Sequence, residues 1–344
     1  MFAQTPASQI LARHEDIFAD KTVLISGDFH DDYPVLLKTK QSFIHCSQYH
    51  IYQELFSRKV DNVNIEFGVY PNQVNYAQID TLIYYWTKNK VEAKFQLSFL
   101  LNSLAKNVDI FIVGENRIGV NSAEKLLSDF GSITKIDSAR RCSLYHFSAE
   151  SRLAFDEQEW WTNYKIEMND FEVNVCGLPG IFSQKNLDQG TELLLESVLD
   201  RPEIVKGAVL DLGCGSGVLT AFLAKLNPSI TPTATDVSAA ALASTNKTLA
   251  ENNITANVIA SDVFSDIDGR FDLIISNPPF HDGKETSYKA VETLIAQAKN
   301  HLNKGGKLCI VANTFLPYQQ LLSNYFNKVD LITSTTKFKV YCVS

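Results

Sequence analysis

The chain has 344 residues, a length that predicts about two domains, and 45% of its residues are hydrophobic, which is ample for ordinary cores. Its formal net charge of −8 argues against a surface coated with basic side chains for binding bare nucleic acid. The six cysteines form no CxxC pair and have no metal-ligand spacing, which excludes a disulfide scaffold and a metal cluster. No apolar run reaches about 18 residues, which excludes a membrane span. We therefore expect a soluble, cytoplasmic protein with reduced thiols, no metal and no signal peptide.

Four apolar segments of the first half predict strands of an α/β fold. They are residues 23–28, 80–86, 109–116 and 141–145. After them, residues 151–160 are polar and are expected to link two domains.

The second half begins with a hairpin pattern. Residues 164–168 and 171–175 alternate polar and apolar side chains on either side of Asn169-Asp170. We expect Trp160 and Trp161 to anchor this hairpin by packing. Residues 192–199 then predict a helix, and Thr191 before it would either close over a bound cofactor or cap the helix.

A glycine loop follows at residues 211–217, between a predicted strand and a predicted helix at 218–226. The loop begins with Asp211 and contains Gly213, Cys214, Gly215 and Gly217. Because the third glycine comes one residue too early for the dinucleotide fingerprint, the loop matches class I methyltransferases instead. We expect these residues to bind the methionine part of S-adenosylmethionine, since glycine allows the backbone close to a ligand.

Two further acids come at the ends of the next predicted strands. Asp236 lies 25 residues after Asp211, and Asp262 lies 26 residues further on. Ligands of open parallel sheets bind at the carboxyl ends of the strands. We expect Asp236 to accept hydrogen bonds from the ribose hydroxyls of the donor and Asp262 from its adenine amino group.

A fourth strand, residues 271–276, leads into Asn277-Pro278-Pro279-Phe280. The Asn277 side-chain oxygen and the Pro278 main-chain oxygen can accept the two hydrogens of a conjugated amine, so that its lone pair points at the donor's methyl group. The prolines restrict the backbone and hold both acceptors in place beforehand, and Phe280 offers a ring for stacking on a base. This arrangement predicts methyl transfer to an exocyclic or amide nitrogen.

Methylation at a pyrimidine carbon is less compatible with the sequence. That reaction needs a cysteine beside the base, whereas Cys214 lies in the donor loop and Cys309 in an apolar strand. His281, directly after the motif, is a candidate for substrate contact or proton relay, and Lys284 is a further candidate.

The two halves resemble each other. The segments at 80–86, 109–116 and 141–145 match those at 272–278, 307–313 and 337–341 in the same order. Residues 23–28 occupy the place of the glycine loop but keep only Gly27, and Tyr85-Trp86 replace the amine-binding residues. We infer a duplicated fold whose first copy has lost catalysis and supports the second copy or recognises substrate.

Local basic clusters are the candidates for RNA contact, since both halves are acidic. Residues 1–150 hold 15 basic and 17 acidic side chains, and residues 151–344 hold 16 and 22. Besides Lys284, the clusters are Lys88, Lys90 and Lys94; Arg140 and Arg141; and Lys337 with Lys339.

The motif at 277–283, the segment 188–191, the glycine loop and the duplicated first half together resemble the ribosomal RNA small subunit methyltransferase C family, essentially end to end. The resemblance implies α/β architecture with two tandem class I (Rossmann-like) methyltransferase domains. These are a degenerate copy at 1–150 and a catalytic copy at 161–344. It also implies S-adenosyl-L-methionine as the donor and the guanine N2 amine of 16S rRNA, within the assembled 30S subunit, as the acceptor. Asn277, Pro278 and Phe280 would engage the guanine, and we expect a monomer.

Two alternatives remain open from the residues alone. The acceptor could be another amine, such as adenine, a large-subunit rRNA guanine or a protein glutamine. Alternatively, the chain could be a non-enzymatic ribosome-assembly factor that keeps a vestigial donor site.

Overall fold

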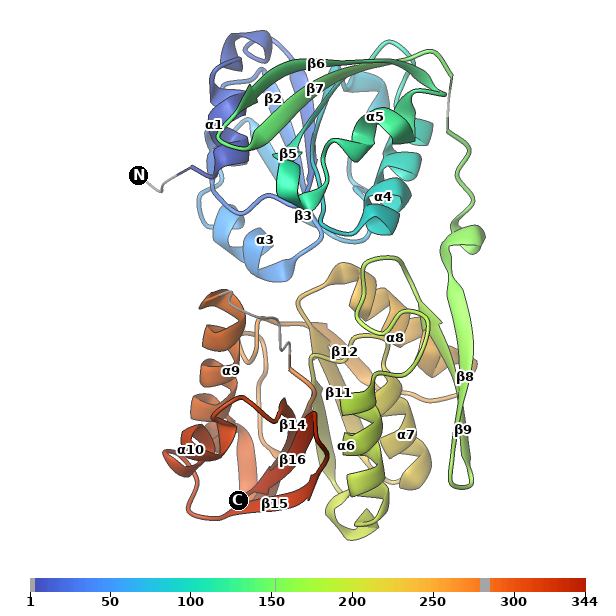
Figure 1. The fold of residues 1–344 in the computed structure, drawn as a ribbon, viewed down its shortest axis with the longest axis vertical. Helices are drawn as coiled ribbons and strands as arrows, with labels where there is room; N and C mark the ends of the chain where they lie inside the picture. Colours follow the sequence, from blue (N-terminus) through green and yellow to red (C-terminus); the bar gives the residue numbers. More distant parts are fainter. Residues whose placement is uncertain (1–3, 152, 279–284) are drawn as a thin grey trace. The chain divides into compact units, whose positions relative to one another are not determined.

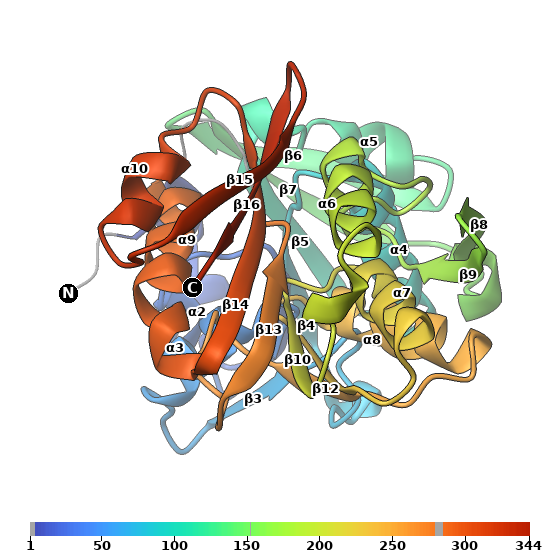
Figure 2. The ribbon, with the colours of Figure 1, turned by 90° about the horizontal axis from the view of Figure 1, so that it is seen from below.

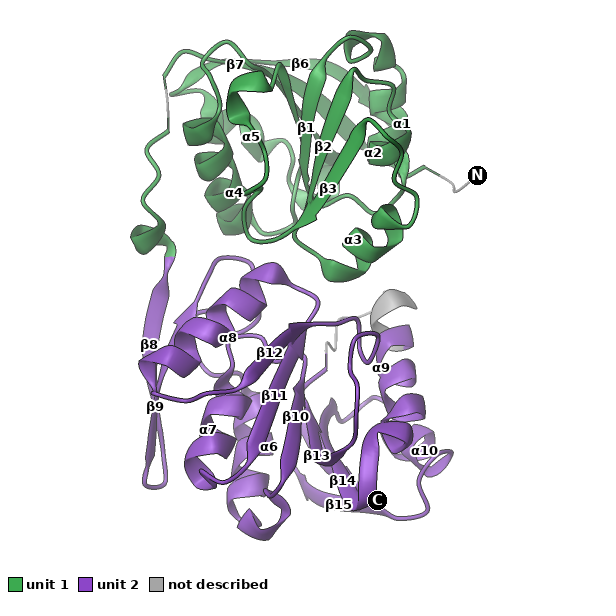
Figure 3. Ribbon diagram, turned by 180° about the vertical axis from the view of Figure 1, so that it is seen from behind, with its two compact units in different colours: residues 1–160 green, residues 161–344 purple. Residues whose placement is uncertain are grey.

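The computed structural model describes residues 4–151, 153–278 and 285–344 (Figure 1). Contacts within the chain divide it into two compact units, residues 1–160 and 161–344, here called unit 1 and unit 2 (Figure 3). None of the helices in the described part of the chain has the length and apolar character needed to cross a membrane.

Unit 1 contains one seven-stranded sheet. Its strands are β1 (Thr22–Gly27), β2 (Gln41–Cys46), β3 (Val63–Phe67), β4 (Thr81–Tyr85), β5 (Asp109–Glu115), β6 (Gly131–Ala139) and β7 (Cys142–Ala149). Its helices are α1 (Pro6–Ala12), α2 (Tyr33–Leu36), α3 (Tyr49–Phe56), α4 (Lys90–Ser103) and α5 (Ser122–Leu127). The strand order is β3-β2-β1-β4-β5-β7-β6, and only the pairings that involve β7 are antiparallel.

Unit 2 contains a second seven-stranded sheet and a separate hairpin. The hairpin pairs β8 (Thr162–Met168) with β9 (Phe171–Gly177). The sheet strands are β10 (Ala208–Leu212), β11 (Thr231–Asp236), β12 (Asn257–Ala260), β13 (Phe271–Ser276), β14 (Leu302–Asn313), β15 (Val329–Ser334) and β16 (Phe338–Val343). The helices are α6 (Gln189–Leu199), α7 (Val218–Leu226), α8 (Ala239–Glu251), α9 (Glu285–Ala298) and α10 (Tyr318–Ser323).

The centre of the sheet of unit 2 is buried on both faces, which explains why β10 and β13 are almost entirely buried and mostly apolar. Figure 2 shows α6, α7 and α8 on one face and α9 with α10 on the other. Successive residues of β13 therefore enter different cores: Leu273 and Ile275 pack with the first set of helices, and Ile274 packs with the second.

The predicted duplication is confirmed by the topology. Unit 2 has the strand order β12-β11-β10-β13-β14-β16-β15, which repeats the order of unit 1 strand for strand. A side-chain contact recurs as well: Asp80 accepts a hydrogen bond from the Thr22 amide, and Asp272 accepts one from the Ala208 amide, both at 2.9 Å. In each copy this carboxylate ties the start of one central strand to its neighbour.

Several predicted elements agree with the structure, and others differ from it. The helix Val218–Leu226, the strand Phe271–Ser276 and the hairpin are confirmed. The helix expected to begin at residue 192 begins at Gln189, because the Asp188 carboxylate caps it, so capping by Thr191 was wrong.

The segment expected to be a linker, 151–160, packs on unit 1. Leu153 is buried in that unit's core, and the Phe155 ring lies 5.3 Å from the Phe99 ring. Trp160 lies beside Phe95 of the same unit, with ring centroids 5.4 Å apart. The Trp160 ring therefore packs on unit 1, and its expected role in anchoring the hairpin stays a prediction.

Candidate active site

The predicted site residues of unit 2 gather at one edge of its sheet. The glycine loop follows β10, Asp236 ends β11, and Asn277 follows β13. Strands β10 and β13 are parallel neighbours at the centre of the sheet, where the strand order reverses direction. Such a switch point is where open α/β sheets bind ligands.

The glycine loop leaves open space above its backbone. Gly213 and Gly215 have φ values of +80° and +57°, in the left-handed region that favours glycine. A β-carbon at either position would meet no atom of the described residues within 4 Å. At Gly217, by contrast, a β-carbon would lie 3.0 Å from Thr245. The first two glycines therefore leave room for a ligand, and the third allows helix α8 to pack closely.

Asp211 supplies a buried acceptor beneath this loop. Its Oδ2 accepts hydrogen bonds from the Thr220 amide at 3.1 Å and the Thr220 hydroxyl at 2.6 Å. Its Oδ1 is buried without a partner among the described residues. Burial raises the pKa of this carboxyl to about 7. An unpaired buried acceptor is costly, which is typical of an atom that bonds to a ligand.

Asp236 holds the loop in place. Its Oδ2 accepts from the Gly215 amide at 3.0 Å, and its Oδ1 accepts from the Ser238 amide at 2.9 Å. Burial raises the pKa of this carboxyl above its ordinary value. Asp262 follows β12 at the same edge and is exposed. The two acids thus differ, since Asp236 is part of the loop's framework and Asp262 faces solvent.

Cys214 lies inside the loop and is buried. The Thr245 hydroxyl lies within hydrogen-bonding distance of both its sulfur, at 3.2 Å, and the Gly215 carbonyl, at 3.1 Å. Burial raises the pKa of the Cys214 thiol well above its ordinary value. The thiol is therefore protonated at neutral pH and is a poor nucleophile.

Asn277 has one end of its amide anchored and the other end unpaired. Its Nδ2 donates hydrogen bonds to Asp188 Oδ2 at 3.1 Å and to Thr191 Oγ1 at 2.7 Å. Its Oδ1 is buried and has no partner among the described residues. Pro278, directly after it, is buried. The Ser276 hydroxyl donates to the Leu212 carbonyl at 2.7 Å, which fixes the end of β13 to the end of β10.

Three predicted residues, Phe280, His281 and Lys284, lie outside the described residues. Thr191, predicted to bind the cofactor, is brought to Asn277 by its hydroxyl. Asp188 was not predicted as part of the site. The signal that could have found it was the short segment before helix α6, in which an acid precedes Gly190 and Thr191.

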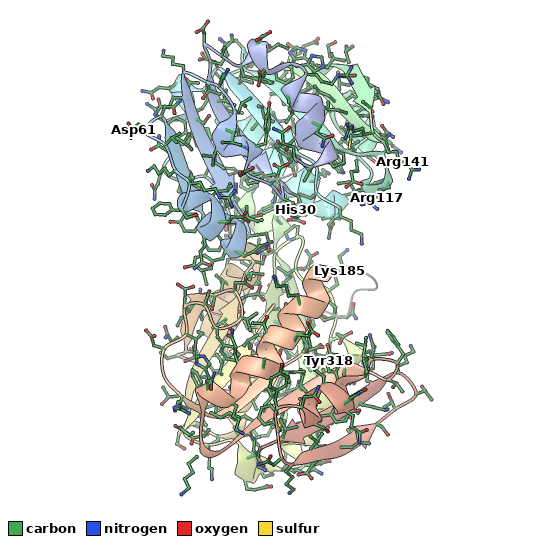
Figure 4. The ribbon with its side chains drawn as sticks, turned by 90° about the vertical axis from the view of Figure 1, so that its left-hand side faces the viewer. His30, Asp61, Arg117, Arg141, Lys185 and Tyr318 are labelled. Carbon is green, nitrogen blue, oxygen red and sulfur yellow. The ribbon has the colours of Figure 1, made fainter. Side chains whose placement is uncertain are left out.

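Topology places the basic clusters of unit 1 at the carboxyl edge of its own sheet. Lys88 and Lys90 follow β4 and are exposed. Arg140 and Arg141 form the two-residue turn between β6 and β7, beside the end of β5. Figure 4 shows Arg117 and Arg141 at the same end of unit 1, and the Arg141 carbonyl accepts from the amide of the residue before Arg117.

The remaining clusters are less uniform. Lys94 lies on helix α4 with its ammonium 6.0 Å from the centre of the Trp160 ring. In unit 2, Lys337 is exposed in the turn before β16, and Lys339 is half-buried within that strand.

The position in unit 1 that corresponds to the glycine loop differs from that of unit 2, because a β-carbon at Gly27 would lie 2.0 Å from the Tyr85 carbonyl oxygen. Gly27 therefore serves backbone packing and leaves no open space.

Comparisons with known proteins agree with this geometry. Residues 172–342 match the family model described as "Methyltransferase small domain", and residues 8–164 match "Methyltransferase small domain N-terminal". Relatives named "Ribosomal RNA small subunit methyltransferase C" include one from Erwinia tasmaniensis, 49% identical over 99% of this chain and 97% of its own length. Another, from Yersinia pseudotuberculosis, is 50% identical over 99% of this chain and 96% of its own length.

A solved structure shares the whole fold. It is a T. thermophilus 16S rRNA N2 G1207 methyltransferase in complex with AdoMet and guanosine, with a TM-score of 0.84 and 19% sequence identity. The match covers 99% of this chain and 92% of that protein. On the evidence of its relatives over nearly its full length, the chain belongs to the ribosomal RNA small subunit methyltransferase C family.

Proposed function

We propose that unit 2 transfers a methyl group from S-adenosylmethionine to the N2 amine of a guanine in 16S rRNA, with the assembled small ribosomal subunit as substrate. The observation that carries the proposal is the buried Oδ1 of Asn277, which has no hydrogen-bond partner in residues 4–151, 153–278 and 285–344, at the sheet edge that carries the open glycine loop. The names of the relatives support small-subunit ribosomal RNA as the substrate, and the solved T. thermophilus complex, with its bound AdoMet and guanosine, supports both the donor and the guanine.

The residues at the loop fit this donor. Gly213 and Gly215 would lie against its methionine part, since both leave open space. Asp211 offers an acceptor, without a partner among the described residues, for a positively charged or hydrogen-bond donating group of the ligand. Asp236 and Asp262 follow successive strands and would accept from the ribose and the adenine. Cys214 would contribute to donor binding as part of the loop that carries these glycines.

S-adenosylmethionine, when bound, supplies a methyl group activated by the positive charge on its sulfur. The protein has to hold the amine in line with that methyl group. The guanine amine is a weak nucleophile because its lone pair is delocalised into the ring. Asn277 Oδ1 and the Pro278 carbonyl would accept its two hydrogens and turn the lone pair toward the methyl. The methylated nitrogen then loses a proton to water, so that no strong base is required.

Substrate contacts extend beyond these two acceptors. Phe280 would stack on the base, with His281 and Lys284 close by in the sequence. Lys88, Lys90, Arg140 and Arg141 of unit 1, and Lys337 and Lys339 of unit 2, would contact phosphates of the rRNA. Because the whole chain carries a net charge of −8, a folded particle that offers shape and local contacts is a better substrate than bare RNA.

Unit 1 would have no donor site and would serve as support or in substrate recognition, and the protein would act as a single chain. At the position equivalent to Asn277, counted from Asp80 and Asp272, unit 1 has the buried Tyr85. Its hydroxyl lies 2.9 Å from the Ser8 hydroxyl, so this position is filled by packed side chains.

The test is a methylation assay with tritiated donor and separated small subunits, large subunits and ribosomal proteins. We expect label in 16S rRNA of small subunits from cells that lack this protein, at one guanine. Label confined to large subunits or to protein would overturn the assigned acceptor. Asn277→Ala should bind the donor with unchanged affinity and lose at least a hundredfold in turnover, about the effect of removing one catalytic hydrogen bond. Undiminished turnover would refute the mechanism, and donor binding without methylation of any acceptor would indicate an assembly factor.

A further inference from the structure

The amide of Asn277 can catalyse the proposed reaction in only one of two orientations. An asparagine side chain turned over by 180° would present its NH2 group, which can only donate, where the substrate amine also donates. The two orientations have nearly the same shape, so packing alone cannot select between them. A group that selects the orientation must therefore distinguish the oxygen from the nitrogen by hydrogen bonding.

Asp188 makes that distinction. An ionised carboxylate has acceptors only, so its Oδ2, 3.1 Å from Asn277, must receive an N–H bond. The Thr191 hydroxyl, 2.7 Å from the same nitrogen, accepts the second hydrogen. With both Nδ2 hydrogens engaged, Oδ1 faces the other way, where it is buried and has no partner among the described residues.

The start of helix α6 holds these two groups in position. Asp188 is the N-cap, and its Oδ2 also accepts from the Gly190 amide at 2.8 Å and the Thr191 amide at 3.1 Å. A β-carbon at Gly190 would lie 2.9 Å from this same oxygen and 3.2 Å from the Phe338 ring. Three residues of the segment thus have a physical reason: Asp188 is the acceptor, Gly190 leaves space beside it, and Thr191 supplies the hydroxyl.

We propose that Asp188 and Thr191 are positioning residues that orient Asn277 with its oxygen toward the substrate amine. This inference rests on the proposed function of Asn277. Neither residue touches substrate in this scheme, and both act through the Asn277 amide. The ionised carboxylate also polarises that amide, which strengthens the acceptor at its far end.

A purely structural role is the competing explanation, because unit 1 has a similar contact. Ser8 follows its own N-cap by three residues, as Thr191 follows Asp188, and its hydroxyl lies 2.9 Å from the Tyr85 hydroxyl. There the contact joins a helix start to a strand end in the copy that we expect to be inactive. The test must therefore separate turnover from stability.

Three variants make this separation. Thr191→Val removes the acceptor at nearly constant volume, Thr191→Ser restores it, and Asp188→Asn keeps a good helix cap but permits the Asn277 amide to turn over. We expect Thr191→Val and Asp188→Asn to lower kcat at least tenfold, with the donor Kd and the KM for small subunits changed less than threefold. Thr191→Ser should stay within threefold of the parent protein. Ser8→Ala in unit 1 is the matched control and should lower the melting temperature without changing kcat.

A double-mutant cycle with Asn277→Ala completes the design. If Thr191 acts only through Asn277, adding Thr191→Val to Asn277→Ala should cause no further loss of kcat. Folded Thr191→Val and Asp188→Asn proteins with unchanged kcat would overturn the inference. The inference would also fail if Thr191→Val lowered kcat as much in the Asn277→Ala background as it does in the parent protein. If Thr191→Val does not fold, Asp188→Asn decides. Undiminished turnover of Asn277→Ala would instead overturn the proposed role of Asn277, and label confined to large subunits or protein would overturn the assigned acceptor, so these failures are distinguishable.

Discussion

Replacing Gly215 by alanine should separate donor binding from folding. Its φ of +57° is close to the ideal left-handed conformation, and its β-carbon would face open space. The only folding cost is therefore the left-handed backbone of a non-glycine residue, roughly 1–2 kcal/mol. For a unit of this size, each kcal/mol lowers the melting temperature by about 2–4 °C. The amide that bonds to Asp236 is retained.

Donor binding should weaken as well, for a separate reason. The added methyl carbon occupies the space against which the donor would lie, so we expect its affinity to fall at least tenfold, or about 1.4 kcal/mol. Titration calorimetry with S-adenosylmethionine measures the affinity, and thermal unfolding measures the stability of the same samples. Gly27→Ala is the contrasting variant, because its β-carbon would lie 2.0 Å from the Tyr85 carbonyl oxygen and the backbone must move. A Gly215→Ala protein that folds and binds the donor with unchanged affinity would refute this account of the loop.

Three further predictions concern RNA contact, pH and donor stoichiometry. Arg140 and Arg141 have φ values of +51° and +63° in a two-residue hairpin turn, where Asn-Gly is favoured. The double variant Arg140→Asn, Arg141→Gly should therefore have an equal or higher melting temperature. Its binding to small subunits should weaken, and the slope of log affinity against log salt concentration should fall in magnitude by about 2. An unchanged slope would exclude phosphate contacts at this turn. The pKa of Asp211 is about 7 in the folded protein against an ordinary 3.8, so the folded state binds the extra proton and stability falls as pH rises through this range. Denaturant unfolding without donor tests this prediction. Between pH 6 and pH 8, the free energy of unfolding should fall by about 1.4 kcal/mol more in the parent protein than in Asp211→Asn. An equal pH dependence in the two proteins would contradict the shifted pKa. Calorimetry should also find one donor site per chain; two sites would show that unit 1 keeps a functional loop.

Local patterns predicted most of the fold because they depend on neighbouring residues. The helix at Val218–Leu226 and the strand at Phe271–Ser276 were expected from apolar spacing alone, and the doubled architecture followed from the repeated order of segments. Apolar content could not assign Trp160 to the hairpin or to unit 1, because a large ring packs on whichever apolar surface lies nearest. The polar composition of residues 151–160 likewise did not predict that Phe155 packs on Phe99 of unit 1, because composition does not show which surface a single ring contacts.

The site shows the same division at the level of single atoms. The type and order of its residues were readable: glycines that permit left-handed backbone, acids at strand ends, and an asparagine beside proline. The roles of Asp188 and Thr191 were not readable, because they lie 89 and 86 residues from Asn277 in the sequence. Only the pairing of parallel strands and the docking of helix α6 against their ends bring these groups within bonding distance.

The sequence by itself therefore determined the class of chemistry, because methyl transfer to an amine requires residue types that are visible in short motifs. Tertiary structure decided which acceptors have hydrogen-bond partners and which have none within the described part of the chain. Hydrogen bonds are short and directional, so a donor or acceptor is assigned only once distant segments are packed. That is how Asp236 became a support of the loop, and how one oxygen each of Asp211 and Asn277 was buried without a partner among the described residues.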